Sequence, residues 1–232
     1  MLVDARRRAK FLNRLFDAKG RLFLDIGCSD GRVEERFGKY KDRFVGIDID
    51  EKALRAAKGG YLKAVLADAV HLPFKDESFD GIICSEVMEH IKDDHQAAKE
   101  IARVLKRDRA LVVSVPNGEF ENMFLFKSLA RNYYKRLENI VLHVRKGYTV
   151  SGIKRLFESE SLRLQKYEYD LKAVGAFFHL FLWFLYSHQE TKFRRFILRS
   201  YIRLLAVLAP MYSLDNILKR EGLQIFARFV KV

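Results

Sequence analysis

The sequence predicts an α/β protein built on a doubly wound, mostly parallel sheet, and three observations support this fold class. Short apolar segments of strand length alternate along the chain with segments of helical character, which is typical of parallel strands joined by helical crossovers. The first apolar segment, residues 21–26, runs into a turn with two glycines, as a buried strand does before a helix. The second, residues 43–48, ends in an acid, and the carboxyl ends of such strands form ligand sites.

The remaining elements follow in the same alternation. Helices are expected near residues 30–38, 51–58, 93–106 and 149–159. Further strands are expected at residues 62–67, 79–84, 110–115, 162–169 and 223–231, so that the sheet would have seven strands. Residues 171–220 stand between the last two expected strands and form a long insertion.

The chain is expected to form one main domain with two additions. Residues 21–170 and 221–232 would form the sheet domain, residues 1–20 a basic amphipathic helix, and residues 171–220 a helical insertion. With 232 residues, 49% of them hydrophobic, the chain can bury a full core. Two cysteines, Cys28 and Cys84, indicate a reducing setting without disulfides. The first residues have no apolar signal region, so we expect a cytoplasmic protein.

The loop after the first expected strand indicates a class of cofactor through its charge. Gly27 and Gly31 are separated by three residues, and Ser29 stands where a dinucleotide fingerprint has its middle glycine. Acids at Asp25 and Asp30 would repel a pyrophosphate at short range. They favour a ligand with positive charge and hydroxyl groups, and S-adenosylmethionine, a sulfonium with an ammonium group and a ribose, has both.

Five motifs follow one another in order: Asp25–Gly31, Val45–Ile49, Ala67–Phe74, Ser78–Ser85 and Glu100–Leu105. Together they resemble the motifs of class I S-adenosylmethionine-dependent methyltransferases, in the type 11 group that includes quinone-pathway and small-molecule enzymes. The resemblance implies a Rossmann-like seven-stranded sheet. The helical, aromatic-rich and basic insertion before the last strand is a feature of this chain, since family members usually join the last two strands by a short hairpin. The sequence departs from the family at Ser29, usually glycine, and at Lys106–Arg109, usually a proline-glycine turn.

The resemblance also implies residues for the methionine side of the cofactor pocket. Asp25, Gly27, Cys28 and Gly31 would form this side. The backbone near Ser85 would close the floor beneath the sulfonium.

The adenosine side would be formed by the ends of the next two strands. Asp48 stands about twenty residues after Asp25, near the spacing at which an acid accepts hydrogen bonds from ribose hydroxyls. By resemblance, Ile49 would pack against the adenine. Asp68 would accept a hydrogen bond from the adenine amino group, while the N–H of Ala69 would donate to the ring.

The candidates for chemistry follow the fourth expected strand. In one interpretation His90 is the general base that takes a proton from a bound hydroxyl. In another, Glu86, Glu89, His90 and His143 bind a divalent metal ion that orients and acidifies the acceptor oxygen. The spacing resembles metal motifs of ubiquinone-pathway O-methyltransferases and small-RNA 2′-O-methyltransferases. A third interpretation, a structural role in lining the pocket, is the preferred one, and no metal is expected.

The insertion gathers positive charge and aromatic residues. Residues 117–232 contain 20 Lys and Arg against 10 Asp and Glu, and so carry most of the net charge of +13. Residues 173–186 form an apolar run that is too short to span a membrane. In residues 192–208, basic residues fall on one helical face and apolar residues largely elsewhere. This pattern, shared by residues 1–20, is typical of a helix that lies at a membrane surface.

These observations lead to one expected function and several alternatives. We expect methyl transfer from S-adenosylmethionine to a small or lipid-like acceptor, at oxygen, by in-line displacement. The insertion would dock on an anionic membrane surface, which would make the protein peripheral at the inner membrane face, or would form a soluble lid over the substrate. An RNA methyltransferase that uses the basic residues for phosphate contacts ranks below these. A protein that binds the cofactor without catalysis is the rival from another class, and the oligomeric state stays open.

Overall fold

The computed structural model describes residues 2–16, 19–29, 31, 42–57, 61–119, 144–172 and 222–232. The contacts divide the chain into two compact units. The first contains residues 1–115, 148–168 and 226–232, and the second contains residues 116–147 and 169–225. Most of the predicted site residues belong to the first unit. The predicted insertion lies almost wholly outside the described residues.

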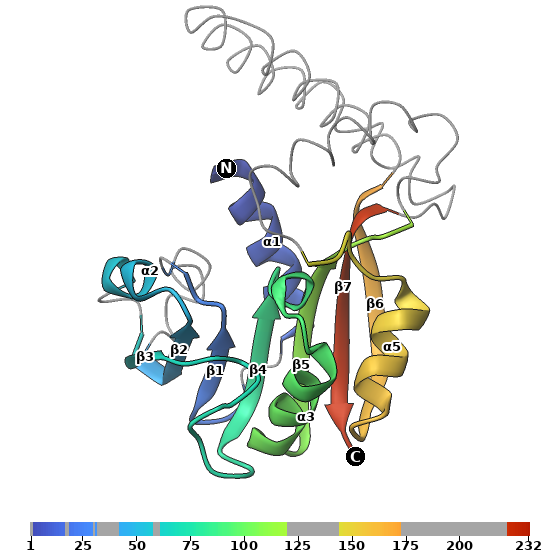
Figure 1. Cartoon of the computed structure of the whole chain (residues 1–232). Helices are drawn as coiled ribbons and strands as arrows, with labels where there is room; N and C mark the ends of the chain where they lie inside the picture. The colour runs from blue at the N-terminus through green and yellow to red at the C-terminus, as the bar shows by residue number, and fades with distance from the viewer. Residues whose placement is uncertain are drawn as a thin grey trace, which may run out of the picture. The chain divides into compact units, whose positions relative to one another are not determined.

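The sheet has the seven strands that the sequence predicted. They are β1 (Phe23–Ile26), β2 (Phe44–Asp48), β3 (Lys63–Leu66), β4 (Phe79–Ser85), β5 (Leu105–Pro116), β6 (Leu162–Lys172) and β7 (Gly222–Lys231). Their order in the sheet is β3-β2-β1-β4-β5-β7-β6. The first five are parallel to one another, whereas β7 runs opposite to β4 (Figure 1). The order reverses between β1 and β4, and such a reversal places a ligand crevice at the carboxyl ends of these strands.

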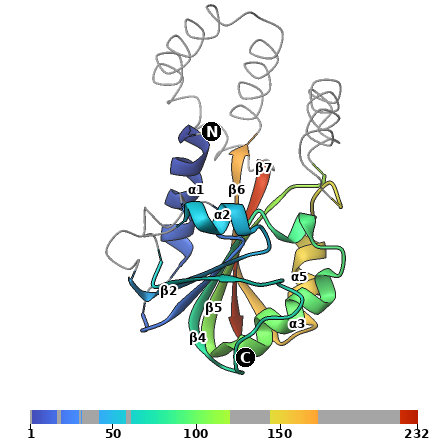
Figure 2. The same ribbon diagram turned by 60° about the vertical axis from the view of Figure 1, so that its left-hand side comes forward.

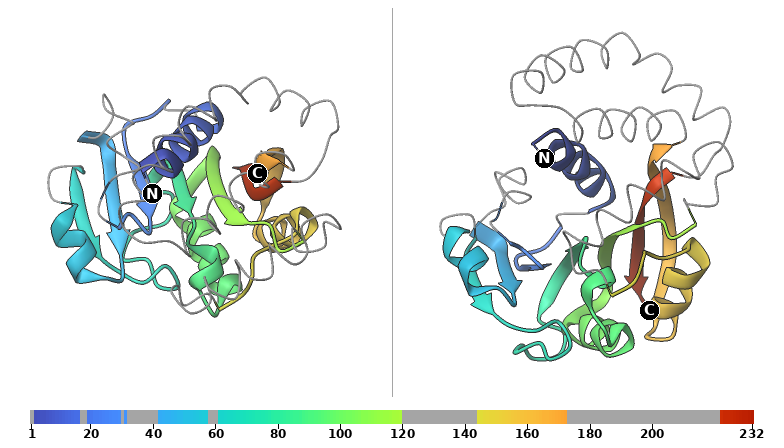
Figure 3. Two further views of the ribbon diagram at one scale, coloured as in Figure 1. Left: turned by 90° about the horizontal axis from the view of Figure 1, so that it is seen from above. Right: turned by 45° about the horizontal axis from the view of Figure 1, so that its top comes forward.

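Helices lie on both faces of the sheet. The described ones are α1 (Leu2–Leu15), α2 (Glu51–Ala56), α3 (Asp94–Val104) and α5 (Val150–Glu158), with a short 3-10 helix, η3, at Met88–His90. Figures 2 and 3 show α1 on one face, with α3 and α5 side by side on the other. The helix expected at residues 30–38 lies outside the described residues except for residue 31. Within the described part of the chain, no helix has the length and apolar character that crossing a membrane requires.

The side chains of β7 show how the sheet separates two apolar layers. Phe226 belongs to the cluster beneath α1, and Phe11 of that helix stacks on it with ring centroids 4.8 Å apart. Phe229, an odd number of positions later, packs on Phe157 of α5 at 4.9 Å. Because successive side chains of a strand point to opposite faces, the two phenylalanines serve the two helical layers.

The structure corrects the interpretation of the N-terminal helix as a membrane-surface helix. Leu12, Leu15 and Phe16 are buried in a cluster with Phe23 and other residues of the sheet. The helix is amphipathic, as predicted, but this apolar side packs against the sheet. Periodicity alone could not tell an apolar face that meets lipid from one that meets a sheet, since both have the same pattern.

A second correction concerns the segment before the fifth expected strand. The sequence predicted a helix to residue 106 and a strand from residue 110, whereas α3 ends at Val104 and β5 begins at Leu105. Pairing with β4 joins Phe79 to Leu105 and then Gly81 to Ala110, so residues 106–109 bulge from the ladder. The bulge is held by charge, because the Lys106 ammonium lies 2.9 Å from a carboxylate oxygen of the buried Asp80.

Candidate functional site

A cavity of about 350 Å³ lies at the carboxyl ends of β1, β2 and β3 and beside the segment after β4. We call it the strand-end cavity. It lies at the crevice that the strand order predicts. Of the residues that the sequence singled out, those that line it are Gly27, Asp48, Ile49, Asp68, Ala69 and His90. Asp25, Cys28, Gly31 and Ser85 do not line it.

The glycine loop, residues 27–31, contains residues with positive backbone φ angles. Gly27 has a φ of 71° and Gly31 a φ of 78°, which glycine adopts without steric cost. The N–H groups of Gly27 and Cys28 both donate to the carbonyl of Ile47 at 2.9 Å, which ties the loop to the end of β2. A β-carbon at Gly27 would lie 2.2 Å from a methyl group of Val87. The first glycine is therefore needed both for its φ and for the close approach of the segment after β4.

Ser29, the departure from the family pattern, also adopts a left-handed conformation, with a φ of 48°. Its N–H donates to Asp48 at 2.8 Å. The other carboxylate oxygen of Asp48 accepts from the N–H of Asp50 at 2.9 Å. Two backbone donors thus fix the orientation of this carboxylate. Each carboxylate oxygen has a second lone pair, so Asp48 keeps acceptor capacity for a ligand hydroxyl.

The adenosine side of the predicted pocket is open. The Ile49 side chain is 73% exposed although it is large and apolar. Asp68 is exposed too, and one of its oxygens accepts from the N–H of Val70 at 3.1 Å. An apolar surface with a carboxylate beside it is suited to a planar ring that carries an amino group.

Asp25, which was predicted for the methionine side, does not line the strand-end cavity. It is only 2% exposed, and its carboxylate accepts a hydrogen bond of 2.6 Å from the hydroxyl of Tyr61. This hydrogen bond joins β1, just before the glycine loop, to the residues that precede β3. Tyr61 was missed by the sequence analysis, and no sequence signal pairs it with an acid on a strand that it reaches only in the folded chain.

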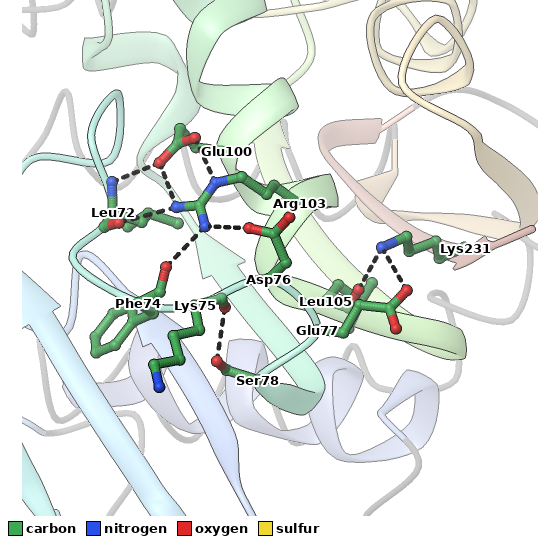
Figure 4. A network of polar contacts seen from close by, with 10 residues as sticks. All are labelled: Leu72, Phe74, Lys75, Asp76, Glu77, Ser78, Glu100, Arg103, Leu105 and Lys231. Atoms are coloured by element: carbon green, nitrogen blue, oxygen red, sulfur yellow. Dashed lines mark hydrogen bonds and ion pairs between the residues drawn. The ribbon is translucent and has the colours of Figure 1, made fainter.

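The loop that carries Asp68 is held by one arginine (Figure 4). Arg103 of α3 donates to the carbonyls of Leu72 and Phe74 at 2.9 and 2.7 Å. It also pairs with Glu100 and Asp76, and Glu100 accepts from the N–H of Leu72. The hydrogen bond from Arg103 holds the pKa of Glu100 below its ordinary value, although burial acts in the opposite direction. The sequence offered one clue, a Glu and an Arg three apart on a helix.

Carboxylates gather where β4 ends. Burial raises the pKa of the Cys84 thiol well above its ordinary value, and the negative charges of Glu89, Asp25 and Glu86 raise it further. Glu86 has a left-handed φ of 57° and accepts from the hydroxyl of Ser114 at 2.9 Å. Cys84 is therefore an unreactive core residue between acids.

Glu89 and His90 of η3, both candidates for catalysis or metal binding from the sequence, lie in different surroundings. Glu89 is 1% exposed, whereas His90 is exposed and lines the strand-end cavity. Within the described ranges, no three His, Cys, Asp or Glu side chains come together as a metal ion requires. His143, the fourth ligand of the metal alternative, lies outside those ranges.

The part of the chain that contains these residues is similar in sequence to known proteins. Residues 24–113 match a family described as a methyltransferase domain. The O-methyltransferase cnsE of Penicillium expansum is 34% identical over 110 residues, which are 44% of this chain and 40% of that protein. The ubiquinone biosynthesis O-methyltransferase of Coxiella burnetii is 27% identical over 132 residues, 54% of this chain and 56% of that one. The chain thus spans about half the length of the curated relatives it matches.

A solved structure shares the fold over nearly the whole chain. The S-adenosylmethionine-dependent methyltransferase of Archaeoglobus fulgidus has a TM-score of 0.61 at 18% identity, with 98% of this chain and 94% of that one covered. At this identity the likeness concerns the fold, and it confirms the Rossmann-like sheet.

Proposed function

We propose that the protein transfers a methyl group from S-adenosylmethionine to a small or lipid-like acceptor at oxygen, because residues 24–113 match a family described as a methyltransferase domain. The observation that carries this proposal is the strand-end cavity, where Asp48, Asp68 and Ile49 stand at the ends of neighbouring strands. Each meets one part of an adenosine: a carboxylate for the ribose, a carboxylate for the amino group and an apolar side chain for the ring.

The chemistry is an in-line displacement at the methyl carbon. The acceptor oxygen forms a bond to this carbon while the bond from carbon to sulfur breaks, and S-adenosylhomocysteine leaves. The proton of the acceptor hydroxyl goes to a base. His90 is the proposed base, because it is exposed and lines the same cavity. When bound, the sulfonium cofactor supplies the activated methyl group, and the protein supplies mainly position.

Calorimetry with S-adenosylmethionine tests the cofactor assignment. We expect the wild type to bind, and Asp48→Ala to bind about a hundredfold more weakly, because a charge-assisted acceptor and the anchor of Ser29 are both lost. Asp50→Ala is the matched control, since Asp50 caps α2 through the N–H of Lys52 and does not line the strand-end cavity. A wild type that does not bind, or an Asp48→Ala variant that binds equally well, would contradict the assignment.

Radiolabelled methyl transfer to a panel of phenols and catechols then tests turnover. With any acceptor found, His90→Ala should lose at least about a hundredfold in kcat at saturating cofactor, the usual size of a general-base contribution. Cofactor binding with no turnover on any acceptor, including RNA, would favour the protein that binds without catalysis.

We further propose cytoplasmic location with docking on anionic membrane surfaces through the insertion. The support is the sequence pattern of residues 173–186 and 192–208, an apolar run followed by a basic and aromatic segment. These residues lie outside the described part of the chain. Sedimentation with vesicles, with and without anionic lipid at low salt, is the test, and protein that stays in the supernatant would end this proposal.

A further inference from the structure

The carboxylate of Asp25 has a short hydrogen bond from a residue outside every motif. The Tyr61 hydroxyl lies 2.6 Å from Oδ2 of Asp25, a distance typical of a hydrogen bond to a charged oxygen. A carboxylate that is 2% exposed is costly to bury without such donors. This contact therefore fixes the position of a side chain two residues before Gly27.

The ring of Tyr61 fills space that two glycines leave open. A β-carbon at Gly46 would lie 3.0 Å from two ring carbons of Tyr61 and 2.9 Å from the sulfur of Cys28. A β-carbon at Gly31 would lie 3.4 Å from a third ring carbon. The ring thus lies against β2 on one side and against the last glycine of the glycine loop on another.

Tyr61 itself stays outside the strand-end cavity. It is half-buried, packs against the apolar cluster beneath α1, and lines a separate surface cavity with residues of α2. Its influence on a ligand must therefore act through the residues it touches.

We propose that Tyr61 is a positioning residue that holds the glycine loop in its ligand-binding conformation. Its hydroxyl binds Asp25 just before the loop, and its ring lies against Gly31 at the end of the loop. The segment between them, with Cys28 and Ser29, is held in place from both sides. The consequence for cofactor affinity rests on the proposed function, whereas the consequence for the loop itself does not.

Cysteine labelling tests the effect on the loop without any ligand. Cys28 lies in the glycine loop and Cys84 in β4, and both thiols are buried. In Tyr61→Phe, which keeps the ring and removes the hydroxyl, maleimide labelling of Cys28 should be about tenfold faster than in the wild type, because local opening is easier. Labelling of Cys84, measured in the same sample by peptide mass spectrometry, should not change. Equal acceleration at both thiols would mean general loosening and would overturn the proposal.

Cofactor binding provides the second readout. Tyr61→Phe should weaken S-adenosylmethionine binding by about tenfold in calorimetry, while kcat at saturating cofactor changes by less than about twofold. Gly46→Ala, which displaces the ring, should weaken binding as well. Part of the effect of Gly46→Ala should persist in the double variant, because the added β-carbon also lies 2.9 Å from the sulfur of Cys28.

The control is Tyr167→Phe. Tyr167 is 46% exposed on β6, at the opposite edge of the sheet from β3. It should leave both the labelling rates and the affinity unchanged. A wild type that fails to bind would overturn the proposed function, while the labelling result still decides the role of Tyr61 in the loop. A wild type that binds, with Tyr61→Phe unchanged in affinity or in Cys28 labelling, would overturn the positioning role.

Discussion

The carboxylates near the strand-end cavity differ in exposure and in their hydrogen-bond donors. We call the exposed side of this cavity, with Asp48 and Asp68, the open end, and the region of Asp25 and Glu89 the buried end. At the open end, Asp48 and Asp68 accept hydrogen bonds from backbone N–H groups and remain accessible to a ligand. At the buried end, Asp25 accepts from a side chain, and both Asp25 and Glu89 are almost completely buried. All four residues come from strand ends or from the segments just after them.

This difference separates two tasks that look alike in the sequence. Backbone donors orient Asp48 without using its full acceptor capacity, so the carboxylate can still bind ribose hydroxyls. The burial of Asp25 makes it part of the support of the loop. Acids at the ends of parallel strands are therefore not equivalent, and exposure separates the acids that we propose to bind a ligand, Asp48 and Asp68, from the buried Asp25.

The largest effect on binding and stability should come from Gly27→Ala. Gly27 begins the glycine loop and also lines the strand-end cavity. The left-handed φ and a β-carbon 2.2 Å from Val87 would force the glycine loop and the segment after β4 apart. We expect loss of S-adenosylmethionine binding by more than about a hundredfold and a free energy of unfolding lower by about 2–4 kcal/mol. Calorimetry and urea denaturation measure both. Gly152→Ala in the helix α5 is the control, since its φ is not left-handed. If Gly27→Ala bound S-adenosylmethionine as the wild type does, the close approach of Val87 to Gly27 would not be required for binding.

Replacing one buried and one exposed aspartate by asparagine, which has nearly the same shape, tests the difference between the two kinds of acid directly. Asp25→Asn should lower the free energy of unfolding by about 1–3 kcal/mol, because a buried charge-assisted hydrogen bond is weakened. Asp68→Asn should leave stability unchanged, since the side chain is exposed, and should weaken cofactor binding by about fivefold. If the two variants had the same profile of stability and affinity, the division between supporting and ligand-binding acids would be wrong.

The smallest effect concerns Asp80, a buried acid near the amino end of the central strand β4. Burial alone would raise its pKa, but hydrogen bonds from the N–H groups of Arg21 and Leu22 and from Lys106 lower it to about 2. The folded pKa is below the unfolded one, so this carboxylate stabilises the protein above about pH 4 and loses the effect as the pH falls toward 2. Asp80→Asn should cost about 1–2 kcal/mol at pH 7, with screening by solvent included.

Urea denaturation at pH 7 and at pH 3 checks this prediction. The difference in free energy of unfolding between wild type and Asp80→Asn should narrow at the lower pH. Asp76→Asn is the control, because Asp76 pairs with Arg103 while 74% exposed and should show a smaller difference at both pH values. If the difference in free energy of unfolding between wild type and Asp80→Asn grew toward pH 3, the lowered pKa of Asp80 could not be the source of this stabilisation.

Much of the fold could be predicted because its signals are local. Apolar runs and helical periodicity placed all seven strands, and the N-caps Asp50, Asp93 and Thr149 stand where the sequence expected helices to begin. The bulge at residues 106–109 was missed. The bulge carries the pairing of Lys106 with Asp80, a contact between two strands that are separated in the chain by a whole helix.

The sequence by itself determined the parallel sheet, the glycine loop and the place of Asp48, Ile49 and Asp68 beside one another, because the carboxyl ends of neighbouring parallel strands must meet at one edge. Only the tertiary structure decided that Asp25 is buried under Tyr61, that Arg103 holds the loop after Asp68, and that the apolar side of α1 packs on the sheet. The physical reason is that periodicity and spacing record which face of an element is apolar and where it ends. What that face or side chain then touches depends on residues that only folding brings near.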